Sequence, residues 1–191
     1  IIGFTDISAA ILVSATGFYI LGVVVQTLKV KPNERATGRM FKEMLAGFMF
    51  IKASPVFSFL IGMTFFYGMF GMSFIFLMPV FAKEVLGVGA EKIGLLLGAS
   101  GIGSLLGTFI AATMGRRLYS AKTLLGGGAL FGGFLMLFGL VTQLGSYELS
   151  LVVLFFVGVF NTIYLMSVMT HLQSRVPDNF RGRVMGIYTM T

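Results

Sequence analysis

Long apolar intervals alternate with short charged connections along most of the chain. Five intervals contain no Asp, Glu, Lys or Arg, and each holds between 22 and 30 residues. A helix of roughly 20 apolar residues crosses the hydrocarbon core of a bilayer, whereas strands of a membrane barrel are about 10 residues long and alternate in polarity. We therefore predict five transmembrane helices, over residues 7–28, 53–82, 93–115, 123–147 and 149–174.

The long polar interval from Lys29 to Lys52 interrupts this pattern and carries six of the fourteen Lys and Arg residues. Its second half contains apolar residues at helical spacing, with charged residues at other phases. This spacing predicts an amphipathic helix on the membrane surface before Pro55 turns the chain inward. The alternative is a simple extension of the next helix. The apolar positions are Met40, Phe41, Met44, Leu45, Phe48 and Ile51.

The basic residues fix the expected orientation, because Lys and Arg accumulate on the cytoplasmic side of membrane proteins. If the first helix ends in the cytoplasm at Lys29, twelve of the fourteen basic residues lie on that side. The opposite connections hold only Lys83 and Lys92, next to Glu84 and Glu91. We therefore expect a multi-pass protein of the inner (cytoplasmic) membrane with residues 29–52 in the cytoplasm.

Composition supports a polytopic membrane protein and excludes several other classes. The chain is 57% hydrophobic and only 11% charged, with a mean hydropathy of +0.95. The net charge of +7 is spread between apolar runs rather than gathered on a soluble face, so we expect no nucleic-acid partner. One His and no Cys argue against a dedicated metal site. With no recognisable catalytic arrangement, we expect neither enzyme activity nor a cofactor.

A few polar side chains lie inside the predicted spans, where each one is a candidate for a substrate pathway. Asn161 stands near the centre of the fifth span and either faces such a pathway or bonds to a neighbouring helix. His171 lies closer to the charged end of the span. It is either a proton relay or a capped interfacial residue. Pro79 is expected to kink the second span. The candidate pathway residues are Tyr67, Ser73, Asn161 and Tyr164.

Small residues recur every four positions in the third span, at Gly103, Gly107, Ala111 and Gly115. This spacing allows a second helix to approach closely. Static packing and a sliding interface both fit the pattern, so the sequence leaves the two open.

Two stretches resemble the major facilitator superfamily, and in particular its enterobactin-exporter-like branch. The first covers Gln173, Val176, Pro177, Asp178, Arg181, Gly182 and Arg183, which are similar to the pattern Q-x-x-V-P-D-x-x-R-G-R-V between the tenth and eleventh helices. The second is the segment LMPVFAKEVLGVGAEKIGLLLGASGIGSLLG, which resembles the seventh and eighth helices of that branch.

The resemblance implies an all-α polytopic membrane protein with part of a twelve-helix fold, in which two halves rock about a central site. Residues 1–28 would be the last helix of the N-terminal half, residues 29–52 the cytoplasmic linker, and residues 53–191 an incomplete C-terminal half. The chain is thus expected to be a fragment that reaches the start of the eleventh helix.

The superfamily's cytoplasmic signature, G-x-x-x-D-R-x-G-R-R, is only partly present. Gly115, Arg116 and Arg117 match it, but Ala112 and Thr113 replace its acidic and first basic positions. The resemblance places these residues at a cytoplasmic gate, and anchoring to anionic lipid is the alternative role. The expected gate or anchor residues are Gly115, Arg116, Arg117, Asp178, Arg181, Gly182 and Arg183.

The expected function is secondary active transport, with export of a small hydrophobic or amphiphilic compound, drug-like or siderophore-like. The alternatives are a lysophospholipid transporter or flippase of the same fold, and a membrane sensor or scaffold that transports nothing. The expected partners are the lipid bilayer, a small-molecule substrate and protons as coupling ion. We expect the full-length protein to be a monomer.

Overall fold

The computed structural model describes residues 7–27 and 40–190, and the regular structure in these ranges is entirely helical. The chain divides into two compact units, Ile1–Met40 and Phe41–Thr191, which are described separately. The first contains α1 (Ile7–Thr27). The elements that follow are α2 (Met40–Ala53), α3 (Pro55–Phe66), η1 (Tyr67–Gly71), α4 (Ser73–Val80), η2 (Phe81–Val85), α5 (Ala90–Met114), η3 (Gly115–Tyr119), α6 (Ala121–Gln143), α7 (Tyr147–Arg175) and α8 (Asp178–Met190).

Four helical stretches in the described ranges are long and apolar enough to cross a membrane, and they coincide with four of the five predicted spans. They are Pro55–Val85, Ala90–Tyr119, Ala121–Gln143 and Tyr147–Arg175. The remaining predicted span is also helical, as α1, although its described apolar part covers only Ala15–Thr27. Large apolar side chains face outward on the four spans, among them Phe76, Leu105 and Phe109. Such exposure suits contact with lipid.

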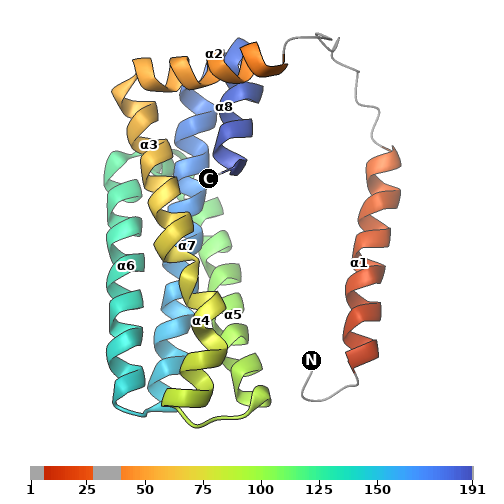
Figure 1. Cartoon of the computed structure of the whole chain (residues 1–191), viewed down its shortest axis with the longest axis vertical. Coiled ribbons are helices and arrows are strands. Elements are labelled where there is room, and N and C mark those ends of the chain that lie inside the picture. Colours follow the sequence, from red (N-terminus) through yellow and green to blue (C-terminus); the bar gives the residue numbers. More distant parts are fainter. Residues whose placement is uncertain (1–6, 28–39, 191) are drawn as a thin grey trace. The chain divides into compact units, whose positions relative to one another are not determined.

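Helix α7 is the centre of the second unit and packs against both α5 and α6 (Figure 1). Its side chains are the most extensively buried of the four spans. Leu154, Val157, Val168 and Leu172 are fully buried along its length. The stretch from α3 to η2 covers a third side of α7, as Figure 1 shows.

Caps and glycines explain where the helices begin and end. Gly115 has a φ of 50°, a conformation that favours glycine, and it ends α5. Ser120 is the N-cap of α6, and its Oγ accepts a hydrogen bond from the backbone N–H of Lys122. Pro55 occupies the first turn of α3, where its missing N–H costs little, and extended Ser54 separates α3 from α2.

The span from Pro55 to Val85 is not one regular helix. It contains two π-helical turns, η1 at Tyr67–Gly71 and η2 at Phe81–Val85. The N–H of Met72 donates to the carbonyl of Tyr67 at 3.1 Å, which is the spacing of a π turn. Pro79, the predicted kink, lies inside α4, and η2 begins two residues after it. Turns of this kind are frequent at functional sites.

Helix α2 is separate from α3 and lies across the end of the bundle (Figure 1), where it packs on α8. The Phe50 ring stacks on Phe180 with 4.5 Å between centroids, and Ile51 is buried in the same cluster as Val184. On the other face, Leu45 and Phe48 are exposed. The predicted apolar stripe is therefore divided between a protein-facing side and an exposed side. Residues 28–39 of the predicted linker lie outside the described residues, as do the side chains of Met40, Phe41 and Met44.

The described charged residues of the second unit lie at the two ends of the bundle. We call the end formed by α2, η3 and the start of α8 the basic end. Its described basic residues are Lys52, Arg116, Arg117, Lys122, Arg175, Arg181 and Arg183. The opposite end carries charges of both signs, at Lys83, Glu84, Glu91, Lys92 and Glu148.

Candidate functional site

The interior of the bundle consists of two hydrophobic clusters that follow one another along α7. The cluster away from the basic end includes Met78, Leu96 and Val157, and the cluster toward the basic end includes Leu60 and Tyr164. Tyr67 packs against both clusters. The junction of the two clusters therefore lies between Val157 and Tyr164 on α7, which is where the sequence places Asn161.

Tyr67 is the first residue of η1, and its side chain connects the helices around this junction. Its ring lies 5.7 Å from the ring of Phe131 on α6 and 5.6 Å from that of Tyr164 on α7, measured between centroids. Its hydroxyl lies 3.4 Å from the sulfur of Met72. An added Cβ on Gly71 would lie 2.8 Å from Cδ2 of Tyr67. The ring of Tyr67 can therefore occupy this position only because Gly71 has no side chain.

The amide of Asn161 lies near the side chain of Tyr67. Its Oδ1 is buried and has no hydrogen-bond partner within the described ranges. A buried amide oxygen that accepts no bond is costly, because it has lost water without gaining a substitute. The junction therefore retains an unused acceptor near Tyr67.

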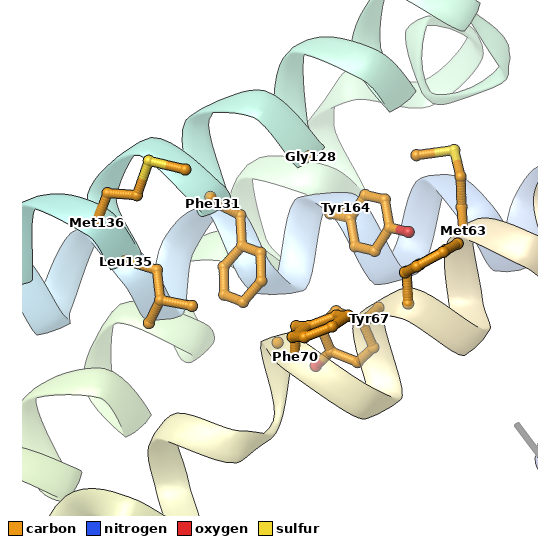
Figure 2. A pocket seen from close by; sticks show the side chains of 11 residues that line it. Met63, Tyr67, Phe70, Gly128, Phe131, Leu135, Met136 and Tyr164 are labelled. Atoms are coloured by element: carbon orange, nitrogen blue, oxygen red, sulfur yellow. The ribbon is translucent and has the colours of Figure 1, made fainter. Parts of the chain in front are cut away.

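An apolar cavity of about 450 Å³ opens beside this polar junction, between the α3 to η1 stretch and α6 (Figure 2). The rings of Tyr67, Phe131 and Tyr164 face one another at its inner side, as Figure 2 shows. Aromatic and thioether side chains form most of its wall, and three glycines leave space in it. The complete lining is Met63, Phe66, Tyr67, Phe70, Gly71, Gly128, Phe131, Gly132, Leu135, Met136 and Tyr164.

The four predicted pathway residues therefore occupy different positions. Tyr67 and Tyr164 line the aromatic cavity, and Asn161 lies next to Tyr67 at the polar junction. Ser73 does not line the cavity, and its hydroxyl donates to the carbonyl of Met69 on the preceding turn. Sequence reasoning missed Phe131, since nothing distinguishes it among 21 phenylalanines.

His171 is buried on α7 rather than exposed at an interface. Its Nδ1 lies 2.8 Å from the carbonyl oxygen of Ser167, which can only accept, so Nδ1 carries the proton in this contact. Its Nε2 and the Oγ of Ser167 are buried without hydrogen-bond partners among the described residues. Buried polar atoms of this kind commonly bind an internal water.

The predicted gate or anchor residues gather at the basic end in different environments. Arg116 and Arg117 are exposed on η3, after the turn at Gly115. Arg181 lines a polar cavity with Tyr119 of η3. The guanidinium carbon of Arg183 lies 5.4 Å from the centroid of the Phe180 ring. Gly182 is exposed, and the side chain of Asp178 lies outside the described ones.

The predicted small-residue face of α5 lies directly against α7. Gly103, Gly107 and Ala111 are buried there. A Cβ on Gly103 would overlap the carbonyl of Phe155, and a Cβ on Gly107 would lie 2.5 Å from the carbonyl oxygen of Val159. Gly158 on α7, which stands in no four-residue series, makes the reciprocal approach to the carbonyl of Ser100.

Comparison with protein families agrees with this architecture of apolar helices around a central span. Residues 1–191 match the family model described as Major Facilitator Superfamily. Comparison with curated proteins and with solved structures gave no match. The match extends over the whole chain, so the chain belongs to the Major Facilitator Superfamily of membrane transporters and is an integral multi-pass membrane protein.

Proposed function

We propose that the protein is a secondary active exporter of a small hydrophobic or amphiphilic compound, drug-like or siderophore-like, and that it works by alternating access. The observation that carries the proposal is the polar junction at Tyr67 and Asn161 beside the aromatic cavity. Apolar pockets with a few convergent polar groups are the usual form of small-molecule sites. The membership of the enterobactin-exporter-like branch is part of this proposal.

The chemistry of the cavity supports the substrate class. Its described wall contains no charged side chain, and it includes five aromatic rings from Phe66, Tyr67, Phe70, Phe131 and Tyr164. Aromatic walls of this kind contribute a large apolar contact area, while tyrosine hydroxyls supply hydrogen bonds at one edge. A compound with an apolar body and one hydrogen-bonding group would satisfy both parts, because the side chains of Tyr67 and Tyr164 line the cavity.

The same proposal assigns the remaining parts of the chain. Residues 1–28 belong to the N-terminal half, residues 29–52 form the cytoplasmic linker, and residues 53–191 belong to the C-terminal half of a longer protein. The basic end faces the cytoplasm of the inner membrane, and its arginines serve as gate or anchor. The described apolar spans contain no Asp or Glu in their interior, so a carboxylate that couples transport to protons would lie elsewhere in the full-length protein.

Vesicle transport by the complete protein tests the proposal. The full-length protein is placed in proteoliposomes, and the movement of a labelled hydrophobic dye and of a labelled lysophospholipid is measured with a proton gradient and after its collapse. We expect gradient-dependent movement of the dye. Movement of the lysophospholipid alone would favour the flippase alternative, and no gradient-dependent movement of either compound would favour a sensor or scaffold.

A further inference from the structure

A second cavity, of about 440 Å³, lies at the basic end and differs in chemistry from the aromatic cavity. Three elements meet around it: the end of η3, the last turns of α7 and the start of α8. Its described lining residues are all polar, and none is acidic. They are Tyr119, Thr170, Gln173, Ser174 and Arg181.

The charge around this cavity favours an anion. Five basic side chains belong to η3, the start of α6 and the start of α8, and no carboxylate has a described side chain there. The side chains of Glu43 and Asp178 lie outside the described ones. The C-terminus of α7 disfavours an anion and the N-terminus of α8 favours one, so the two helix dipoles oppose each other. The charged side chains therefore decide the sign. They are Arg116, Arg117, Lys122, Arg181 and Arg183.

The lining groups also match the hydrogen-bonding needs of a phosphate. Arg181 has another interaction in the structure, but its planar guanidinium carries five N–H donors and suits phosphate oxygens. The hydroxyl groups of Tyr119 and Thr170 and the amide of Gln173 add neutral donors. Ser174 already donates to the carbonyl of His171 at 3.2 Å, so it contributes least.

We propose that this cavity is a specific binding site for a phosphate group, with the headgroup of an anionic phospholipid as its expected source. Tyr119 is 53% exposed, and tyrosines at the ends of membrane spans commonly lie at headgroup level. The site differs from the general attraction of basic residues for anionic lipid, because it requires neutral donors at defined positions. General attraction depends only on the number of positive charges.

Variants that change hydrogen bonds but not charge separate these two modes of binding. Thr170→Val and Tyr119→Phe each remove one neutral donor from the cavity without changing the net charge. Arg175→Gln removes a positive charge from an exposed position next to Ser174 that does not line the cavity. Unfolding temperatures in detergent establish that each variant is folded. Thr170→Val and Tyr119→Phe remove different donors, so each variant tests the proposal separately.

Native mass spectrometry of the full-length protein with phosphatidylglycerol and with phosphatidylcholine provides the test. We expect retention of phosphatidylglycerol over phosphatidylcholine, and a loss of about three- to tenfold in Thr170→Val or Tyr119→Phe, since hydrogen bonds to charged groups are strong. Arg175→Gln should retain the lipid within about twofold, as expected for an exposed charge.

Inorganic phosphate at millimolar concentration identifies the source of the phosphate group. Persistence of the bound lipid supports the headgroup, whereas displacement supports the same site with a soluble phosphate ester as its ligand. Equal retention of the two lipids would overturn the proposal. A loss in Arg175→Gln as large as in folded Thr170→Val and Tyr119→Phe would do so as well, because it would indicate diffuse attraction alone.

Discussion

Tyr67 connects several features of the molecule at a single position. It begins a π turn, packs against both hydrophobic clusters, lines the aromatic cavity and approaches the amide of Asn161. Its tyrosine identity and its place inside a span made it a candidate from the sequence. Its contacts with Phe131 and Tyr164 could not be predicted, because they depend on how three helices meet.

Gly71→Ala should disturb this position. The added Cβ would lie 2.8 Å from Tyr67 and 3.1 Å from Phe131, so the ring of Tyr67 must move away from its present contacts. We expect a reduced transport rate and a loss of stability of about 1–3 kcal/mol from overpacking. Transport in proteoliposomes and thermal unfolding measure the two effects.

Gly62→Ala is the matched control for this change, because it lies in α3 and an added Cβ there meets nothing within 4 Å. Alanine is the better helix former by up to about 1 kcal/mol, so the control should be neutral or slightly stabilising. Equal behaviour of the two variants would contradict the role given to Gly71.

Helices α5 and α7 pack closely, because glycines on both let the backbones approach each other. The four-residue spacing in α5 predicted one side of this contact from the sequence. The other side, at Gly158, was missed since a single glycine in an aromatic-rich helix has no periodic pattern. The overlap that any Cβ would create at Gly103 or Gly158 shows that this contact requires glycine at both positions.

Gly103→Ala and Gly158→Ala should each separate this helix pair. Their added Cβ atoms overlap carbonyl groups of the facing helix, which cannot move without shifting the helix itself. We expect each variant to lose about 1–3 kcal/mol of stability, measured by thermal unfolding of the full-length protein. Gly98→Ala, whose Cβ meets nothing within 4 Å, is the control and should unfold like the wild type.

The charge pattern predicted the positions of the spans but not the residues at which the helices begin and end. The charge-free intervals predicted the spans, but α5 begins at Ala90 and includes Glu91 and Lys92, because helices continue into the interface beyond the hydrocarbon core. The π turns η1 and η2 were not predictable. Their hydrogen bonds depend on local packing, such as that of Tyr67 on Gly71. No residue pattern in the chain predicts these two turns.

At the scale of the whole molecule, charge separates the two ends of the bundle, and this separation was predictable from the connections alone. The proposed orientation places Lys122 at the inner face of the membrane and Lys92 at the outer face. The chain contains no Cys, so single cysteines can be introduced without background from these residues.

Labelling of Lys122→Cys and Lys92→Cys with an impermeant maleimide tests the orientation in intact cells. We expect Lys92→Cys to react in intact cells and Lys122→Cys to react only after the membrane is opened, because both positions are exposed at opposite ends. The reverse pattern would contradict the orientation, and with it the cytoplasmic position of residues 29–52.

The central claim is that the polar junction beside the aromatic cavity lies on the transport pathway. The most direct test compares kcat/KM for dye transport by full-length wild type, Asn161→Leu and Ser73→Ala in proteoliposomes. Ser73→Ala is the matched control, since its hydroxyl bonds only within its own helix. We predict a loss of about tenfold or more in Asn161→Leu, because the polar junction next to Tyr67 would lose its amide, and near wild-type transport in Ser73→Ala. Wild-type transport by a folded Asn161→Leu variant would contradict the account.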